Sequence, residues 1–195
     1  MWINHEKQFV FIAVPKCAST SMAHSLGFTD FSPKPKLYHA SINDVRNEHE
    51  QTKKYFSFGF TRNPFDRLVS VFMNGHQDVG HLSEWGSGLE NYEGSFERFV
   101  KDFPTSKWKD WIHFLPCSYF LTTDNVVSVD FVGKYESLGL DFQSIAQRFG
   151  VSTNMDVFYK SNRESDYKKY YDNEMIDIVS RFFADDLKHF GYSYE

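Results

Sequence analysis

Apolar runs of strand length alternate along this chain with stretches of helical periodicity. Residues 9–14 (FVFIAV) are apolar throughout and predict a buried strand, while residues 55–61 (YFSFGFT) place phenylalanine at every second position and predict another. Residues 126–135 supply a further strand. Because strands that alternate with helices form parallel sheets, the pattern predicts an α/β fold that binds its ligand at the carboxyl ends of the strands.

Helix start and stop signals add detail to this outline. Residues 19–26 predict a helix closed by Gly27, and Asn63 with Pro64 indicates the N-cap and first position of a second helix. The buried stripe expected on the second helix consists of Phe65, Leu68, Val69 and Phe72. Further helices are expected over residues 96–103 after the cap Ser95, over 138–149 before Gly150, and from the cap Asp172 to about residue 189.

Two tracts fall outside this regular pattern. Residues 75–94 lack periodicity and hold several glycines, and such long loops are often functional, so this one is expected to form part of an acceptor pocket or its lid. A disordered surface loop is an equal alternative, and a solvated loop also explains His76, Asp78 and His81 better than a metal site does. The aromatic tract is expected in the core in preference to a sugar-stacking platform; it comprises Trp108, Trp111, Phe114 and Tyr119.

Composition limits the class of protein. A chain of 195 residues without a linker, repeat or low-complexity tract is expected to form one domain, residues 1–195. No run approaches the ~20 apolar residues that span a bilayer, and the N-terminus lacks signal-peptide features, so a cytoplasmic location is expected. The net charge of −5 argues against nucleic-acid binding. Cys17 and Cys117 are too few for a disulfide scaffold or a zinc site, so free thiols are expected.

The first candidate site follows the strand at residues 9–14. Pro15 ends strand pairing, Lys16 supplies a mobile positive charge, and the small residues 18–21 open a helix whose first N–H groups point back toward the strand. This arrangement predicts a cup for an anion such as phosphate. The alternative is an ordinary strand, loop and capped helix. A Walker loop, G-x-x-x-x-G-K-[ST], occurs nowhere in the chain, which disfavours a standard NTPase.

The second candidate site lies at the end of the strand at residues 55–61. Arg62 ends that strand, and Ser70 falls on the face of the following helix that also carries Asp66 and Asn74. A guanidinium is well suited to phosphate because its planar fork donates two parallel hydrogen bonds. The alternative is that Arg62 pairs with a carboxylate and Ser70 faces solvent.

Taken together, the two sites resemble those of sulfotransferases that use 3′-phosphoadenosine 5′-phosphosulfate (PAPS). VPKCASTSM is similar to the family's 5′-phosphosulfate loop, written PKTAGTS or PKTASTS, with Cys17 in place of the usual Thr and Ser19 in place of the commoner Gly. FTRNPFDRLVSVF resembles the 3′-phosphate motif R-[DN]-P-x-[DE]-R-L-x-S. VDFVGKYESL and the C-terminal YYDNEMIDIVSRFFADDLKHFGY extend the likeness over most of the chain. The nearest branch is that of carbohydrate 2-O-sulfotransferases and their bacterial relatives.

The resemblance implies a P-loop-like three-layer fold, with a central, mainly parallel sheet flanked by helices, and a role for individual residues. Lys16 would contact the phosphosulfate and stabilise charge on the bridging oxygen, and Arg62 with Ser70 would bind the 3′-phosphate. Tyr135 matches the adenine-side aromatic, although it is equally suited to the core. Arg163 would add charge near the 3′-phosphate or pair with Glu164. The remaining donor contacts fall on the loop residues Cys17, Ala18, Ser19, Thr20 and Ser21.

A general base is also implied, because an acceptor hydroxyl loses its proton as it attacks sulfur. His39, in LYHASIND, occupies the place of the catalytic histidine of the carbohydrate branch, and an imidazole suits this role near neutral pH. The alternative is a histidine hydrogen-bonded locally before the N-cap Ser41, whose S-x-x-D pattern with Asp44 predicts a capping box. The weaker rivals for the base are His24, His76, His81 and His113.

The implied reaction is in-line transfer of a sulfuryl group from PAPS to an acceptor hydroxyl, which in this branch belongs to a carbohydrate. It releases 3′-phosphoadenosine 5′-phosphate (PAP) and needs no metal. Two other classes stay open. A kinase-like enzyme would prefer ATP with Mg²⁺, and a catalytically silent member would bind PAP or a partner for regulation. Nothing in the sequence indicates the oligomeric state or the identity of the acceptor.

Overall fold

A four-stranded, mainly parallel sheet organises the first of the two units into which the chain divides. The computed structural model describes residues 2–28, 38–77, 88–155 and 163–194. The first unit comprises Met1–Arg62 and Cys117–Tyr159, and the second comprises Asn63–Pro116 and Lys160–Glu195. That the chain forms one domain stays a prediction.

The sheet has the strand order β1-β2-β3-β6. Three of its strands are parallel, and β1 alone runs antiparallel, against β2. The strands are β1 (Trp2–Asn4), β2 (Phe9–Ile12), β3 (Phe56–Thr61) and β6 (Phe131–Lys134). The predicted α/β fold with a mainly parallel sheet is therefore confirmed, whereas β1 was not predicted because its three residues carry little periodicity.

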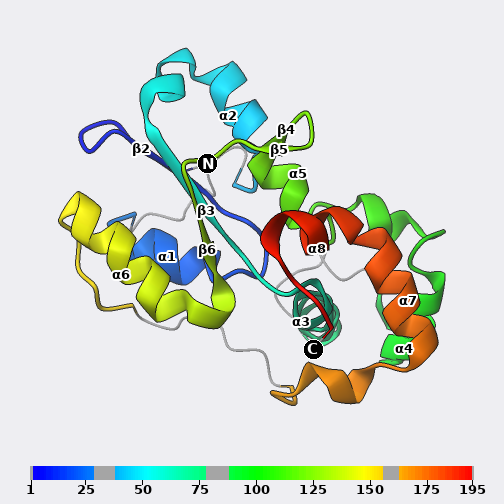
Figure 1. Cartoon of the computed structure of the whole chain (residues 1–195). Helices are drawn as coiled ribbons and strands as arrows, with labels where there is room; N and C mark the ends of the chain where they lie inside the picture. Colours follow the sequence, from blue (N-terminus) through cyan, green and yellow to red (C-terminus); the bar gives the residue numbers. More distant parts are fainter. Residues whose placement is uncertain (1, 29–37, 78–87, 156–162, 195) are drawn as a thin grey trace. The chain divides into compact units, whose positions relative to one another are not determined.

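Helices cover both faces of this sheet (Figure 1). On one face, Phe149 at the end of α6 (Leu138–Phe149) packs its ring against Phe9 and Phe58. On the other face, the Leu121 side chain of α5 (Cys117–Leu121) lies against Gly59, where a Cβ atom would come within 2.5 Å of it. Helix α1 (Ser19–Ser25) lies on the same face of the sheet as α6, and α2 (Ile42–Glu48) lies on the same face as α5.

Several element ends fall where the sequence predicted them. The N-cap Ser41 and Asp44 form the capping box expected before α2, and α6 spans residues 138–149 with Gly150 at φ 59° as its C-cap. The strand predicted over residues 126–135 is two strands: β5 (Val126–Val127), which pairs with β4 (Thr122–Thr123), and β6. The chain turns between them because the Asp130 carboxylate accepts hydrogen bonds from the N–H and hydroxyl of Ser57.

The second unit is helical and is built around an aromatic core. Its longest helix, α3 (Pro64–Gln77), buries the predicted stripe of Phe65, Leu68, Val69 and Phe72. The other elements are η2 (Glu90–Tyr92), α4 (Phe96–Asp102), η3 (Lys107–Asp110), η5 (Tyr167–Tyr170), α7 (Asn173–Phe182) and α8 (Ala184–Phe190). The cap Ser95 accepts a hydrogen bond from the Arg98 N–H, as expected for the start of α4.

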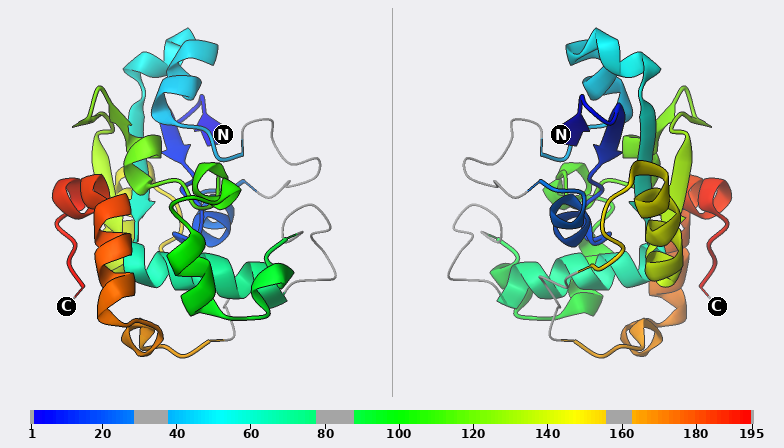
Figure 2. Two further views of the ribbon diagram at one scale, coloured as in Figure 1. Left: turned by 90° about the vertical axis from the view of Figure 1, so that its right-hand side faces the viewer. Right: turned by 90° about the vertical axis from the view of Figure 1, so that its left-hand side faces the viewer.

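The single C-terminal helix predicted from Asp172 to about residue 189 is wrong. Helix α7 ends at Phe182, its C-cap Phe183 has φ −102° and ψ 27°, and α8 leaves in a new direction (Figure 2). Phe183 is 1% exposed and stacks on Phe103, so the break places this ring in the core. Tertiary packing therefore overrides a continuous helical pattern here.

The aromatic tract is mostly in the core, as predicted. Trp108 and Phe114 are buried, and Trp111 packs against the same cluster. Tyr119 contradicts the prediction, because it lies on α5 with 48% of its surface exposed. Within the described ranges, no helix has both the length and the apolar character needed to cross a bilayer.

Candidate functional site

The turn after β2 is braced by its own side chains. Lys16 and Ala18 adopt left-handed backbone conformations, with φ of 62° and 61°. The Cys17 N–H donates to the Val14 carbonyl at 3.3 Å, and its thiol donates to the Pro15 carbonyl at 3.6 Å. The Ser19 hydroxyl also donates to the Val14 carbonyl. Cys17 and the Ser19 hydroxyl therefore shape the turn from within.

The same turn leaves main-chain donors for a ligand. The N–H groups of Ala18, Ser19 and Thr20 meet no acceptor in the described part of the chain. The first N–H groups of a helix have no intrahelical acceptor, and a backbone that alternates into the left-handed region can gather them into an anion-binding cup. Lys16 is half-buried at the rim of this turn, and Ser21 is buried on α1.

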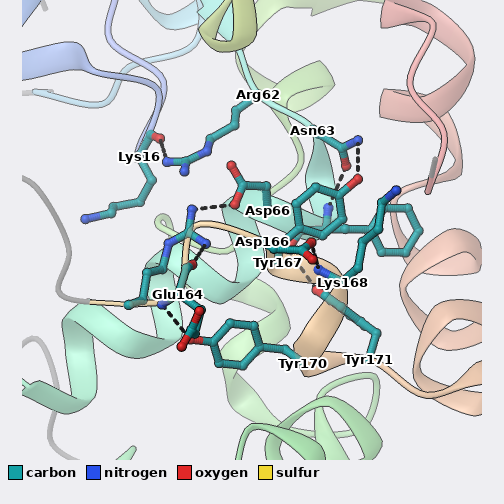
Figure 3. Close-up of polar contacts among 12 residues, drawn as sticks. Lys16, Arg62, Asn63, Asp66, Glu164, Asp166, Tyr167, Lys168, Tyr170 and Tyr171 are labelled. Atoms are coloured by element: carbon teal, nitrogen blue, oxygen red, sulfur yellow. Dashed lines mark hydrogen bonds and ion pairs between the residues drawn. The ribbon is translucent and has the colours of Figure 1, made fainter.

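Arg62 lies at the carboxyl end of β3 and connects the two predicted motifs within the first unit. Its Nη1 donates to the Lys16 carbonyl at 3.1 Å, and its Cζ lies 3.9 Å from the centroid of the Tyr135 ring. Only 5% of Arg62 is exposed. In Figure 3 the Lys16 side chain runs away from this contact, so its ammonium and the Arg62 guanidinium diverge. Arg62 is thus held in place by a carbonyl and an aromatic face.

Tyr135 is fixed in turn by the start of α6. Tyr135 directly follows β6, which ends at Lys134. It therefore lies at the end of a strand, as predicted. The Asp141 carboxylate accepts hydrogen bonds from the Lys134 N–H and the Ser137 hydroxyl, each at 2.7 Å. These bonds hold the turn that presents Tyr135 to Arg62. Asp141 has a positioning role that the sequence pattern did not reveal.

His39 is tied to the strand that leads into the loop. Its Nδ1 lies 2.6 Å from the carbonyl oxygen of Ala13, three residues before Lys16. A carbonyl only accepts hydrogen bonds, so Nδ1 must carry the proton, and the neutral imidazole then has Nε2 as its basic nitrogen. This bond joins residues 26 positions apart, which differs from the local bond of the alternative interpretation.

Ser70 lies on α3 of the second unit. Asn63 caps α3, because its Oδ1 accepts a hydrogen bond from the Phe65 N–H at 3.1 Å. Ser70 is 2% exposed, which contradicts the alternative that it faces solvent. Its role at the 3′-phosphate stays a prediction.

Arg163, also in the second unit, forms a largely buried ion pair with Asp66 of α3. It donates a second hydrogen bond to the main-chain carbonyl of Glu164, whose carboxylate pairs instead with Lys169. Pairing with Glu164 through its carboxylate is therefore wrong, and a role of Arg163 at the phosphate stays a prediction.

One arginine of the motif was given no role by the sequence. Arg67 is 1% exposed, and its guanidinium donates to the main-chain carbonyls of His113 at 3.4 Å and Leu115 at 2.5 Å. It therefore anchors a loop of the second unit. Its position between Phe65 and Leu68 of the buried stripe was the available signal, because a charge on an apolar face must find buried partners.

Most of the loop predicted to shape the acceptor pocket, residues 78–87 with Asp78 and His81, lies outside the described residues. The described residues hold no group of three or more histidine, cysteine, aspartate or glutamate side chains placed to bind a metal ion. Cys17 and Cys117 are both buried, and neither forms a disulfide bond.

Comparison with known proteins decides the family. The model of the sulfotransferase family matches residues 1–193. The chain belongs to the sulfotransferase family. It is 24% identical to carbohydrate sulfotransferase 14 of Danio rerio, an alignment that covers 76% of this chain and 48% of that protein. An uncharacterised protein of Archaeoglobus fulgidus is 28% identical, over 59% of this chain and 84% of its own length.

This sulfotransferase-family chain thus spans about half the length of the carbohydrate sulfotransferase it matches. No solved structure matches it significantly.

Proposed function

We propose that the chain is a sulfotransferase that moves a sulfuryl group from PAPS to an acceptor hydroxyl, with a carbohydrate as the acceptor class. One observation carries this proposal: within the first unit, the Arg62 guanidinium of the 3′-phosphate motif donates to the Lys16 carbonyl of the phosphosulfate loop at 3.1 Å. The name of the relative from Danio rerio supports a sugar acceptor.

The residues of the turn fit the phosphosulfate end of the donor. Three N–H groups without an acceptor among the described residues, those of Ala18, Ser19 and Thr20, suit an anion, and Lys16 adds a full charge. Arg62 is buried and already oriented, so it can offer its fork to the 3′-phosphate with little loss of side-chain entropy. Tyr135 of the same unit would face the adenine of the donor, and the roles of Ser70 and Arg163 stay predictions.

In the reaction, the acceptor oxygen attacks sulfur as the bond from sulfur to the bridging phosphate oxygen breaks. His39 takes the acceptor proton on Nε2, since the Ala13 carbonyl holds Nδ1–H. Lys16 and the loop amides stabilise the electron pair left on the phosphate oxygen of PAP. Positioning and charge neutralisation supply the catalysis, as in phosphoryl transfer.

The proposal predicts different kinetic effects for its three central residues. His39→Ala should lower kcat by about 10²–10⁴-fold because it removes the general base. Lys16→Ala should also lower kcat, by about 10²–10³-fold, because it removes charge stabilisation at the leaving group. Arg62→Ala should mainly raise the KM for PAPS. Transfer of labelled sulfate from PAPS to a panel of carbohydrates measures all three.

His24→Ala is the matched control, since this rival histidine lies half-buried on α1 and its loss should leave kcat near the wild-type value. Equal activity in the His39, Lys16 and Arg62 variants would refute the assigned roles. Binding of PAP without transfer to any acceptor would favour the catalytically silent alternative, and Mg²⁺-dependent ATP turnover would favour the kinase-like one.

A further inference from the structure

Tyr38 connects the phosphate loop to the histidine that follows it. Its hydroxyl lies 3.2 Å from Thr20 Oγ1 in the first turn of α1. Its ring meets the His39 ring edge-on, with 4.6 Å between centroids, and meets the Trp2 ring edge-on at 5.3 Å. These contacts come from three segments of the first unit, so Tyr38 joins β1, α1 and the approach to α2 through one side chain.

The hydrogen bond between the Thr20 and Tyr38 hydroxyls has a direction that a bound ligand would fix. Each has a single proton, so in the Thr20–Tyr38 bond one hydroxyl donates and the other accepts. A phosphosulfate offers only acceptor oxygens, so Thr20 must donate its proton to the ligand if it contacts it. The Tyr38 hydroxyl must then be the donor toward Thr20 Oγ1. Such a chain of hydrogen bonds polarises each member and strengthens the last one.

We propose that Tyr38 is a positioning residue for the donor: its phenol donates to Thr20 Oγ1 and directs the Thr20 proton toward the phosphosulfate, while its ring holds the His39 imidazole in orientation. This inference rests on the proposed function. The Tyr38 hydroxyl thus affects the affinity for the donor, and the Tyr38 ring affects the orientation of the general base.

The separation gives a sharp test. Tyr38→Phe keeps the ring and removes the hydroxyl, so the Kd for PAP and the KM for PAPS should rise by about three- to tenfold, the effect of one lost hydrogen bond, with kcat near wild type. Tyr38→Leu also removes the ring, and kcat should fall in addition. A purely structural tyrosine would not divide its effects between KM and kcat in this way.

A double-variant cycle tests the route through Thr20. Thr20→Val removes the directed hydroxyl and keeps the side-chain volume, so adding Tyr38→Phe to it should weaken PAP binding no further. Tyr55→Phe is the matched control, because it removes a hydroxyl of the same unit that bonds to exposed His5 at 3.1 Å. Tyr55→Phe should leave PAP affinity unchanged.

The outcomes separate this inference from the proposed function. If the wild-type chain binds PAP but Tyr38→Phe and Tyr55→Phe bind it equally well, the role of Tyr38 is refuted and the proposed function stands. Additive losses in the cycle would likewise refute the route through Thr20. If the wild-type chain binds no PAP at millimolar concentration, the proposed function fails, and the role of Tyr38 fails with it.

Discussion

At the residue scale, Lys16 and Ala18 adopt strained backbone conformations that shape the turn after β2. Both have φ near +60°, a conformation that costs most L-residues about 1–2 kcal/mol. The neighbouring thiol and hydroxyl of Cys17 and Ser19 bond to carbonyls of the turn and hold it in this shape. Strain of this kind is typical of ligand sites, where the backbone must present several N–H groups together.

Ala18→Gly should relieve part of this strain. The gain of about 1–2 kcal/mol from the left-handed position is offset in part by the greater entropy of glycine in the unfolded chain, which leaves a net stabilisation of about 0.5–1 kcal/mol. Urea unfolding measures the change. The control is Ala23→Gly inside α1, which should lower the free energy of unfolding by about 1 kcal/mol or more. A destabilised Ala18→Gly would contradict the assigned strain.

Arg67→Leu should be strongly destabilising. It removes the donor to the carbonyls of His113 and Leu115, and each buried acceptor left without a donor costs about 1–3 kcal/mol. Arg98→Leu is the control, because the Arg98–Glu93 pair is exposed and contributes only about 0–1 kcal/mol. Chemical denaturation compares them, and similar losses for the two variants would contradict the anchoring role of Arg67.

At the element scale, the sheet depends on close contacts that only glycine permits. Phe60 of β3 pairs with Gly133 of β6, and its ring covers the glycine so closely that a Cβ there would lie 2.3 Å from a ring carbon. Thr61 of the same strand donates to the Gly133 carbonyl at 3.3 Å. This pairing aligns the ends of β3 and β6, from which Arg62 and Tyr135 project.

Gly133→Ala should therefore destabilise the fold by about 1–3 kcal/mol through overpacking. Phe60→Leu, combined with Gly133→Ala, should recover part of that loss, since the smaller side chain leaves room for the methyl group. The control is Gly139→Ala in α6, where no atom lies within 4 Å of the added Cβ and helix propensity predicts a gain of up to about 1 kcal/mol. Thermal unfolding tests the set, and a neutral Gly133→Ala would contradict the contact.

The tyrosines of the second unit give a pH-dependent prediction. Burial raises the pKa of Tyr171 well above its usual value, and its hydroxyl donates to the Phe65 carbonyl at 2.8 Å. Because the folded pKa is raised, this stabilisation is complete below pH 10, the unfolded value, and is lost as pH rises through the folded pKa. The stability advantage of wild type over Tyr171→Phe should thus shrink above pH 10 in urea unfolding.

Tyr119→Phe serves as the control for that series, because Tyr119 lies exposed on α5. Below pH 10, loss of this exposed hydroxyl should cost less stability than loss of the buried Tyr171 hydroxyl. A stability difference between wild type and Tyr171→Phe that does not change above pH 10 would contradict the linked effect of burial.

At the scale of the whole molecule, local signals predicted much of the fold, and the exceptions have a common cause. Strand β2, the capping box at Ser41 and the end of α6 at Gly150 follow from nearby residues alone. The break at Phe183 and the hydrogen bonds of Asp130 depend on partners far along the chain. Periodicity is a property of residues close together in the sequence, so it could not reveal features that depend on distant partners.

The residues of the candidate site likewise form two groups: those that the sequence revealed and those that it did not. Lys16, Arg62 and His39 stand out because they match motif positions. In the first unit, Arg62 contacts the Lys16 carbonyl, and His39 contacts Ala13 in the segment that leads to Lys16. Tyr38 and Asp141 were missed, because they act on other protein residues and carry no motif of their own. Supporting residues of this kind become visible only once the chain is folded.

The central claim is that the first unit binds both the 5′ end and the 3′-phosphate of one nucleotide. Calorimetric titration with PAP and with AMP, which lacks the 3′-phosphate, tests this claim most directly. PAP should bind at least about tenfold more tightly than AMP, because the 3′-phosphate gains charge-assisted hydrogen bonds from Arg62. Arg62→Met should abolish most of that difference and leave AMP binding unchanged. Equal affinity of the wild-type chain for the two nucleotides, or no heat with PAP at millimolar concentration, would contradict the account.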